Sequence, residues 1–599
     1  MNHLFLFTIG PVQSFIAQAR KTQDLYAGSQ LLSALIKKAV DTVGKEKIVF
    51  PNPSISSFPN RFVAKIDLPE NELQAYGEKI EQVVKEEWKW IALGTPGSWN
   101  LSNPPGFDKQ IEQHLKTHWV FKTIEDDYQV AYKEIEALLA AVKQVTPFEQ
   151  YPEVGRKCSV DGAWNVKFYR RSEGQDRRDE KRIKSKHLFS EDNIIVPFAD
   201  NEKLRLLQPG EGLSAISLVK RAYQLSEMEE FESTADIALL DWKKHYEEEY
   251  EAYKELFDLD DKNYFNAQFL YEDNLTQKQM SKQGIPKELI EKLPIFLEAC
   301  RALTASAREQ QHKLNKYYAI LLFDGDNMGK LLDGNYLTTD KKLADFHHDF
   351  SEKLGLFAEE AKQYLDADNR GRTVYAGGDD FLGFVNLERL LEVLSYLRVQ
   401  FNELVSKPLQ SYFKANSNIT FSAGICIAHY KEPLNLVLKR TRAMEKKAKD
   451  STGKNAFAIA VIKGSGEDHS TVWGFENDNI SKISKLIAQM RKEFISNTFL
   501  QQFQRLFQPL QASNELVEDT NGMYKTEFLR LAKRSVNNIF LGNEKEVIAN
   551  ELVESLWQEL YLSSKTPLIN FFELLNICDF LHRNLNSIKT EQTDEQPTT

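Results

Sequence analysis

The stretch from residue 372 to residue 386 constrains the fold more than any other part of the sequence. Two short apolar runs flank Gly377, Gly378, Asp379 and Asp380. This pattern predicts two antiparallel strands joined by a tight turn, in which the glycines supply the positive φ. The turn would present two adjacent carboxylates at one sheet edge, where they repel each other unless a cation lies between them. Oxygen ligands of this kind favour Mg²⁺ or Mn²⁺.

A second acidic segment follows another predicted strand. Residues 317–323 are apolar, and Asp324-Gly325-Asp326-Asn327-Met328-Gly329-Lys330 comes directly after them. In a ferredoxin-like order this strand lies beside the hairpin, so Asp324 would complete a cluster of three carboxylates. Such a cluster could hold two divalent ions, one activating a 3′-hydroxyl and the other holding a triphosphate. Gly325 would let the backbone approach phosphate closely. The alternative is two surface turns with incidental acids.

Three further residues are candidates for the nucleotide end of this site. Lys449 and Lys454 lie between a predicted helix and the last predicted strand of this region. They could reach triphosphate oxygens as point charges, or they could simply form a lysine-rich helix end that the helix dipole favours. Ser422, in the strand predicted at 419–428, could line a base or ribose pocket, or could be an ordinary small strand residue.

The order of the predicted elements indicates an α+β multidomain protein with a ferredoxin-like palm domain at 313–470, helical middle and C-terminal regions, and an N-terminal α/β domain that could be a second, degenerate palm. Strands near 3–9, 47–50 and 61–66 alternate with helices from about residue 12, at 28–40 and at 71–92. The predicted segments are 1–150 (a degenerate first palm without a carboxylate cluster), 151–312 (an irregular basic stretch and then helices), 313–470 (the catalytic palm), 471–589 (C-terminal helices) and 590–599 (a disordered tail).

Composition restricts the class of protein. The chain of 599 residues has a formal charge of −11, which argues against a protein that simply coats nucleic acid. Basic residues nevertheless crowd into 150–190, and this segment is either a solvated mobile loop or a contact for RNA or a partner. Acidic runs around 227–232 and 247–261 predict solvated surface. Four widely spaced cysteines, no signal peptide and no apolar run long enough for a bilayer predict a cytoplasmic protein without a membrane contact.

Three blocks of sequence resemble one family. They are Ile9-Gly10-Pro11-Val12-Gln13-Ser14-Phe15-Ile16-Ala17-Gln18-Ala19-Arg20-Lys21-Thr22 with Leu25-Tyr26-Ala27-Gly28-Ser29, then Gly210-Glu211 through Leu218-Val219-Lys220-Arg221, and the two acidic segments described above. The chain resembles the large polymerase/cyclase-type subunit of type III CRISPR RNA-guided effector complexes, the Cas ten family, in its III-B (Cmr) form. The family resemblance implies two ferredoxin-like palm domains, a helical middle domain and a helical C-terminal domain.

This resemblance implies an activity in antiviral defence. When guide RNA in the complex pairs with a target RNA, the second palm would convert ATP into cyclic oligoadenylate messengers. Asp324, Asp379 and Asp380 would be the catalytic, metal-holding residues, and Gly377 and Gly378 would shape the nucleotide site. Lys449 and Lys454 match the phosphate-side lysines of related palms less securely. The expected partners are the other subunits, guide RNA, target RNA and ATP.

Two departures from the family keep alternatives open. The first palm starts at the first residues, so the His-Asp nuclease domain of many members is not expected, and neither is DNA cleavage. Some members without that domain join AMP to S-adenosylmethionine, so the acceptor is either ATP or S-adenosylmethionine. Cys158 stands alone, with Asp161 at the position where the pattern of the family has a second zinc-binding cysteine, so no structural zinc is expected. A non-catalytic scaffold that anchors guide RNA is the remaining alternative.

Overall fold

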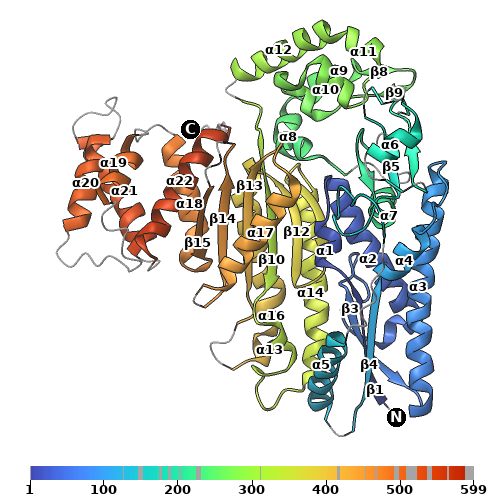
Figure 1. The fold of residues 1–599 in the computed structure, drawn as a ribbon. Coiled ribbons are helices and arrows are strands. Elements are labelled where there is room, and N and C mark those ends of the chain that lie inside the picture. Colours follow the sequence, from blue (N-terminus) through green and yellow to red (C-terminus); the bar gives the residue numbers. More distant parts are fainter. Residues whose placement is uncertain are drawn as a thin grey trace, which may run out of the picture.

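The structure is a computed structural model in which two sheet domains lie side by side (Figure 1). The N-terminal domain, in blue, adjoins the central sheet, in yellow and orange, while the green helices lie above and the red C-terminal helices on the far side. The residues that the structure describes are 2–125, 127–145, 153–172, 174–175, 178–186, 189–190, 192–200, 203, 206–223, 231–309, 312–414, 418–451, 453–464, 466, 468–491, 498–507, 523–535, 543–562 and 566–586.

The N-terminal domain contains an antiparallel sheet with strand order β2-β3-β1-β4. The three predicted strands are confirmed, whereas the last strand and the two helices around it were not predicted from the sequence. The elements are β1 (Asn2–Gly10), α1 (Gln13–Ala17), α2 (Thr22–Val43), β2 (Ile48–Phe50), β3 (Arg61–Asp67), α3 (Leu73–Ser98), α4 (Phe107–His114), β4 (Lys116–Thr123) and α5 (Tyr128–Gln144).

Both faces of β1 are covered, which explains why almost every residue of this strand is apolar. Leu4 and Leu6 belong to a core that includes α5 and helix α14 (Leu343–Asp366) of the central domain. Phe5 and Phe7 point to the other face and pack with α2 and α3. Successive side chains of a strand alternate between faces, so β1 joins the two domains through one set and builds its own domain with the other.

The central domain is a six-stranded sheet of order β11-β12-β10-β13-β14-β15. Its first four strands repeat the order of the N-terminal sheet, and both have the ferredoxin-like sequence of strand, helix, two strands, helix and strand. The elements are β10 (Tyr317–Gly325), α13 (Met328–Leu332), α14, β11 (Gly371–Ala376), β12 (Asp380–Asn386), α15 (Leu390–Phe401), α16 (Lys407–Leu409), β13 (Phe421–His429), α17 (Leu434–Lys449), β14 (Ala456–Ile462) and β15 (Asp468–Gly474).

The predicted boundary at residue 470 needs a correction. It falls inside β15, which pairs along its length with β14, from Ala456 opposite Gly474 to Ile462 opposite Asp468. The sheet therefore extends to Gly474. This strand lies at the sheet edge, its first four residues are polar, and only Thr471 and Trp473 are buried.

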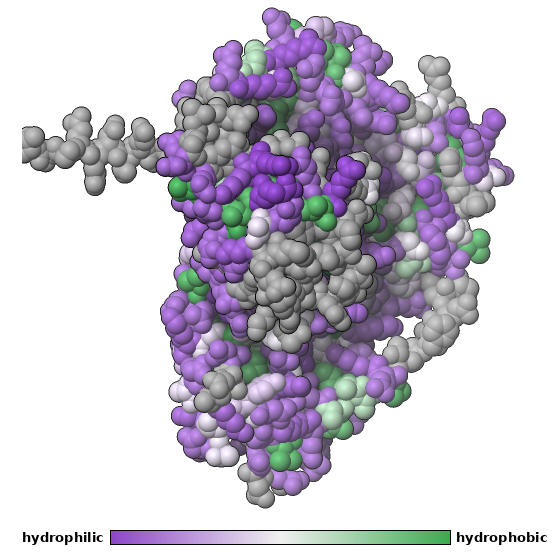
Figure 2. Space-filling view, turned by 90° about the vertical axis from the view of Figure 1, so that its left-hand side faces the viewer, coloured by the Kyte–Doolittle hydropathy of each residue, from purple (hydrophilic) through white to green (hydrophobic). Residues whose placement is uncertain are grey.

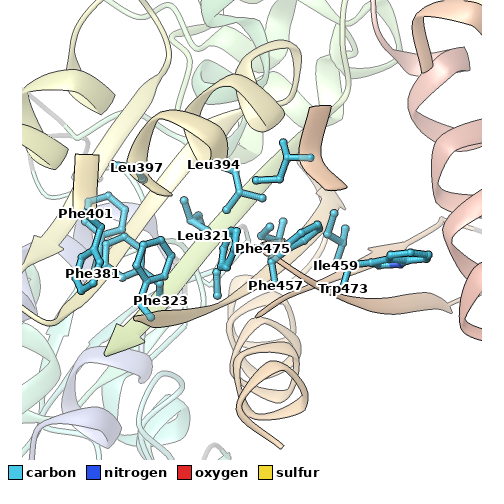
Figure 3. Packing of buried hydrophobic residues seen from close by; sticks show 14 of the residues in the cluster. Leu321, Phe323, Phe381, Leu394, Leu397, Phe401, Phe457, Ile459, Trp473 and Phe475 are labelled. Carbon is cyan, nitrogen blue, oxygen red and sulfur yellow. The ribbon is translucent and has the colours of Figure 1, made fainter. Parts of the chain in front are cut away.

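Helices cover both faces of the central sheet. On one face, Leu394, Leu397 and Phe401 of α15 pack in one layer with residues of the strands and with Phe475, which directly follows β15 (Figure 3). The strand residues are Leu321, Phe323, Phe381, Phe457, Ile459 and Trp473. The stripe predicted for α14 (Leu343, Phe346, Phe350, Leu354 and Phe357) is fully buried in the same core. On the other face, α17 packs across β10, β13 and β14.

Two sequence blocks that resemble the family meet in space. Arg221, buried in α7 (Ala215–Ala222), donates to Asp24 of α2 (2.7 and 2.9 Å) and to Glu211 (2.6 Å). Lys220 beside it donates to the carbonyl oxygen of Phe15 (2.6 Å). Asp24 also accepts from the backbone N–H groups of Arg20 and Lys21, and so fixes the start of α2. The N-terminal and middle blocks therefore form one buried polar network.

Part of the basic segment is ordered, which differs from the interpretation as a mobile loop, whereas a contact with RNA or a partner stays a prediction. Around Phe168–Arg170 (β5) it forms a small sheet of order β6-β5-β7. Arg170 is buried and donates to the carbonyl oxygens of Leu207 and Phe198, and Lys167 is buried beside Glu153. These two cations are therefore not available to RNA. The other elements are α6 (Glu180–Lys186), β6 (Ile194–Val196) and β7 (Gly212–Leu213).

Helices make up most of the middle and C-terminal regions, as predicted. The acidic residues of 247–261 are exposed as expected, whereas 227–230 lie outside the described residues. The remaining elements are α8 (Thr234–His245), α9 (Glu247–Glu255), β8 (Asp258–Leu259), β9 (Lys262–Asn263), α10 (Gln277–Lys282), α11 (Lys287–Glu291), α12 (Leu293–Glu309), α18 (Asn479–Arg491), α19 (Thr498–Phe507), α20 (Met523–Ser535), α21 (Asn543–Val553) and α22 (Leu568–Asn584). The predicted tail, 590–599, lies outside the described residues.

The face seen in Figure 2 is mainly hydrophilic, with isolated hydrophobic residues between the polar ones. Single apolar side chains on a surface are ordinary and need no partner to explain them. Among the described residues, no helix combines the length and the apolar character that crossing a bilayer would require.

Candidate functional site

The glycine pair forms the turn between β11 and β12. Gly378 has a φ of +105°, which a residue with a Cβ rarely adopts, whereas Gly377 is not in this region. Gly377 is needed for a different reason, because a Cβ there would lie 1.7 Å from the hydroxyl oxygen of Tyr375. The N–H of Gly377 donates to the carbonyl oxygen of Asp380 (3.0 Å) and closes the turn. Only one of the two predicted positive φ angles is therefore present.

The three predicted carboxylates lie together at the neighbouring ends of two inner strands of the central sheet, β10 and β12. β10 and β12 pair antiparallel, and Asp324 stands directly opposite Asp380. The N–H of Gly325 donates to the carbonyl oxygen of Asp379 (2.9 Å), which ties the end of β10 to the turn. Opposite residues in an antiparallel pair have Cα atoms about 4.5–5.5 Å apart. The register thus brings together acids from two separate sequence segments.

The negative charges of Asp379 and Asp380 are poorly compensated by the protein groups that the structure describes. Burial, together with the charge of Asp379, raises the pKa of Asp380 to about 7, against a hydrogen bond from Tyr375. Burial also raises the pKa of Asp379, which the positive charge of Arg61 partly opposes. In the part of the chain that the structure describes, the Oδ1 atom of Asp380 is buried and has no hydrogen-bond partner. A buried carboxylate oxygen without a partner is costly, and a bound cation would remove that cost.

Lys449 and Lys454 both reach this end of the sheet. The Nζ atom of Lys449, at the last turn of α17, contacts the carboxylate of Asp324 and lies 3.1 Å from that of Glu445. Lys454 donates to the side-chain oxygen of Asn327 (2.9 Å). Both lysines therefore stand beside the segment that carries Asp324, and their predicted contact with a triphosphate stays a prediction.

The interpretation of Ser422 needs a correction. Ser422 pairs with Asp324 across β13 and β10, but its side chain is fully buried and donates to Asp326 (2.8 Å). It therefore cannot line a ribose pocket in this structure. The sequence analysis missed the part that Asp326 plays: Thr420 (2.8 Å) and the N–H of Asn455 (2.9 Å) also donate to its carboxylate. Asp326 holds together the three segments that surround Asp324.

The first palm contributes a charge that the sequence analysis also missed. Arg61 of β3 forms an ion pair with Glu136 of α5 (3.1 Å), and its positive charge partly opposes the rise that burial causes in the pKa of Asp379 in the second palm. No local sequence signal marks Arg61, because it approaches the carboxylates only through the packing of the two palms.

The environment of Cys158 differs from that of a zinc ligand. All four cysteines are buried free thiols, and the thiol of Cys158 donates to the hydroxyl of Ser217 (3.4 Å). Asp161 accepts hydrogen bonds from the hydroxyls of Ser214 (2.5 Å) and Ser217 (2.7 Å) and from the N–H of Trp164 (2.9 Å). This network of hydrogen bonds fixes the loop where the resemblance would place a second cysteine.

A ferredoxin-like sheet with acids at the ends of its two central strands defines a palm domain of the polymerase and cyclase type. The family model described as "Cas10/Cmr2, second palm domain" matches residues 317–458, and the model "CRISPR-associated protein Cmr2, N-terminal" matches residues 4–55. Two segments of the chain thus match models of the Cas10/Cmr2 family, and the chain is similar to the large subunit of the Cmr (type III-B) form.

One curated relative and two solved structures extend the comparison. The CRISPR system Cmr subunit Cmr2 of Pyrococcus furiosus is 26% identical over 582 residues, which cover 82% of this chain and 65% of the relative. The chain thus spans about two thirds of that protein. Two cryo-EM structures of type III-B Cmr-beta, one in the apo state and one bound to cognate target RNA, match with TM-scores of 0.66 and 0.62, at 14% and 15% identity. Each match covers 97% of this chain, and 82% and 83% of the matched chains, and confirms the fold.

Proposed function

We propose that the second palm transfers adenylyl groups from ATP and builds cyclic oligoadenylate, inside an RNA-guided type III-B complex that has bound target RNA. The observation that carries this proposal is the cluster of Asp324, Asp379 and Asp380 at one sheet edge, with a buried Asp380 oxygen that no described protein group satisfies. The match of this palm to the Cas10/Cmr2 family model supports the assignment of this cluster to nucleotide chemistry.

The residues at this edge fit divalent cations. Three carboxylates offer the oxygen ligands that Mg²⁺ and Mn²⁺ prefer, and the raised pKa values of Asp379 and Asp380 are those of acids held together without enough positive charge. Asp324, Asp379 and Asp380 would hold the cations. When bound, two such cations would supply Lewis-acid activation of a 3′-hydroxyl and stabilisation of the charge on the leaving pyrophosphate.

The protein groups around the carboxylates would bind and orient the nucleotide. Lys449 and Lys454 stand where their ammonium groups could exchange Asp324 and Asn327 for phosphate oxygens. Gly325 and Gly378 add no side chain to the turns that border the site, so a phosphate group could approach the backbone closely there. Asp326 would keep Asp324 in position without touching the nucleotide, since its own carboxylate is buried in hydrogen bonds.

Two molecules are candidates for the acceptor of the adenylyl group, and each gives a different product. ATP as acceptor gives cyclic oligoadenylate, and S-adenosylmethionine as acceptor gives a conjugate with AMP. A cavity of about 120 Å³ lies between α2 and β11, lined by residues that include Tyr26, Arg372 and Tyr375. Pockets for ligands of this size measure roughly 300–1,000 Å³, so this cavity identifies neither acceptor, and ATP follows from the family resemblance.

The proposed partners are the other Cmr subunits, guide RNA and target RNA. The names of the relatives support them, since one relative is a Cmr subunit and one solved structure contains cognate target RNA. A scaffold without catalysis would need the same partners but would have no use for three acids held together at a cost in free energy.

The test uses the assembled complex with guide RNA, target RNA, Mg²⁺ or Mn²⁺ and labelled ATP, with and without S-adenosylmethionine. Mass spectrometry of the products separates cyclic oligoadenylate from a conjugate. Asp379→Asn with Asp380→Asn should remove product. The matched control is Asp260→Asn with Asp261→Asn, an exposed pair of adjacent aspartates in the middle region. Equal product from both double variants would overturn the proposed site.

A further inference from the structure

A cluster of two histidines and one aspartate lies outside the palm site. Asp241 and His245 stand one turn apart on α8, and His312 lies in the segment that leads into β10. One ligand atom of each residue lies within 4.8 Å of the other two. The Nε2 atom of His312 is 3.5 Å, and the Nδ1 atom of His245 is 3.7 Å, from the Oδ2 atom of Asp241.

These separations suit a small divalent transition metal. Zn²⁺ binds imidazole nitrogen and carboxylate oxygen at about 2.0–2.2 Å in a tetrahedron, whose edges are then about 3.4 Å. Both nitrogen–oxygen separations are close to this edge length, yet both exceed an ordinary hydrogen bond. The three side chains thus face one another at ligand spacing, with only a long contact between His312 and Asp241. The Nδ1 atom of His245 also lies 2.8 Å from the backbone carbonyl oxygen of Asp241, a hydrogen bond that an ion on Nδ1 would replace.

Neighbouring groups hold the three residues in place. Burial alone would raise the pKa of Asp241. The hydrogen bond with His312 and the positive charges of His245 and Arg389 outweigh this effect and lower the pKa, so the carboxylate is ionised. The ring of His312 packs against Tyr246, and the backbone N–H of His312 donates to the carbonyl oxygen of Ala307. Support of ligands by surrounding groups is typical of metal sites.

The positive charge of Arg389 opposes a metal at this cluster. Its Nε atom lies 3.8 Å from Oδ1 of Asp241, whereas both histidines approach Oδ2. Its guanidinium donates to Glu392 (2.8 Å), which offsets the charge. Arg389 can therefore remain on one carboxylate oxygen while a metal uses the other.

We propose that Asp241, His245 and His312 bind a Zn²⁺-class ion, with the fourth position open to water. The side chain of His245 is 55% exposed, so an ion can reach the cluster from solvent. Histidine and carboxylate ligands favour Zn²⁺ over Mg²⁺, which distinguishes this site from the all-carboxylate cluster of the palm.

The position of the cluster indicates what the ion would do. His312 precedes the start of β10 and Arg389 follows the end of β12, whereas Asp324 and Asp380 lie at the opposite ends of these strands. The ion would therefore bind α8 to the strand that carries Asp324, but at the far end of the sheet. It would act as a clamp between the middle helices and the second palm.

Metal content of the whole chain, prepared without a polyhistidine tag, tests this proposal. The protein is dialysed against Zn²⁺ in excess Mg²⁺, which keeps Zn²⁺ from the palm carboxylates, and bound zinc is measured by mass spectrometry. We expect one equivalent in the wild type, and binding weakened more than about 100-fold in His312→Gln and in Asp241→Asn. Co²⁺ in place of Zn²⁺ should give the intense visible bands of a four-coordinate ion.

The matched control is His348→Gln, which changes an exposed histidine away from the cluster. It should retain the zinc, and Zn²⁺ should raise the thermal unfolding temperature of the wild type and of this control but not of His312→Gln. The unfolding temperature of each variant is compared with and without Zn²⁺, so the test remains informative even if a variant is less stable than the wild type. Unchanged zinc binding in His312→Gln, or no zinc in the wild type, would show that the cluster is only a set of weak contacts and would overturn the proposal.

Discussion

Asp324 and Asp326 are two residues apart but have very different surroundings. Asp324 stays half-exposed at the sheet edge, whereas Asp326 is 3% exposed and accepts hydrogen bonds from three groups. The carboxylate of Asp324 is therefore available to a cation, whereas the oxygens of Asp326 are occupied by hydrogen bonds within the protein. In an Asp-Gly-Asp segment, the two acids can be told apart only by knowing which strands surround them.

Asp326→Asn should lower adenylate product formation by about 10- to 100-fold, because a shift of about 1 Å in a catalytic group has an effect of this order. The amide cannot accept from all the groups that now donate to Asp326, so the segment that carries Asp324 should move. The measurement is the initial rate of product formation by the complex.

Asp345→Asn, on the exposed side of the first turn of α14, is the control for that variant. It should leave the rate within a factor of about 2, since exposed charges contribute little. If Asp326→Asn also leaves the rate unchanged, Asp326 does not position the site.

Gly378→Ala should destabilise the turn by about 1–3 kcal/mol, because its φ of +105° strains any residue with a Cβ. The space for the methyl group is sufficient, since the nearest atom is 3.7 Å away. The loss of stability therefore comes from the backbone conformation and not from a steric clash. Gly329→Ala is the contrasting variant, because no atom lies within 4 Å and the position is helical. Thermal unfolding should show a lower transition temperature for Gly378→Ala only; equal temperatures would contradict the strain.

At the scale of elements, the second palm was the most predictable part of the chain. The apolar stripe of α14 and the strand patterns of β10, β12 and β13 are determined locally, by residues that alternate or recur at helical spacing. β4 and β15 were missed because each is partly exposed and carries polar residues such as Lys116 and His469. Patterning finds buried elements most readily: it missed the edge strands β4 and β15, although it found the edge strands β2 and β11.

The difference between local patterns and long-range packing also explains which site residues could be predicted from the sequence. Asp324, Asp379 and Asp380 follow from a strand order that the sequence predicts. Arg61 and the cluster of Asp241, His245 and His312 depend on packing between domains, for which the sequence carries no local signal. The sequence argument against zinc considered cysteines only and could not detect ligands that meet across two domains.

The contact between α5 and α14 predicts a dependence of stability on pH. His347 is buried between the palms, accepts from the hydroxyl of Tyr128 (2.9 Å) and bonds to the carbonyl oxygen of Leu332 (2.8 Å). Burial lowers the pKa of His347 from 6.5 to about 4. The unfolded chain therefore binds a proton that the folded chain does not, and stability falls as the pH falls from 6.5 to 4, by at most about 3 kcal/mol.

His347→Gln should reduce the difference in unfolding temperature between pH 7 and pH 4.5, since glutamine does not titrate. His348→Gln, which changes the exposed neighbour, should keep the difference of the wild type. Two variants with the same pH dependence would show that His347 does not contribute.

At the scale of the whole molecule, the two palms share one apolar core. Leu4 and Leu6 of the first palm and Phe350 of the second belong to the same cluster, and the ring of Phe350 stacks on Phe50 at 6.5 Å. Apolar surface shared in this way makes the two sheets depend on each other for burial. We expect them to unfold as one cooperative unit.

Phe350→Ala tests this coupling and should remove about 3–5 kcal/mol from the free energy of unfolding. Hydrogen exchange should then increase in β1 as well as in β10, although β1 lies in the other palm. Leu356→Ala, at an exposed position of the same helix, should change neither strand. Faster exchange in β10 with unchanged protection of β1 would indicate two independent domains.

The repeated strand order of the two sheets has a consequence for assembly. Two palms carried by one chain meet at a fixed stoichiometry and at an effective concentration that dilution does not change. A pair of separate palm proteins would instead associate less as each became scarcer. Any chemistry that needs both palms in this molecule should therefore have the same specific rate at every protein concentration, so the cell cannot regulate it through the abundance of one palm relative to the other.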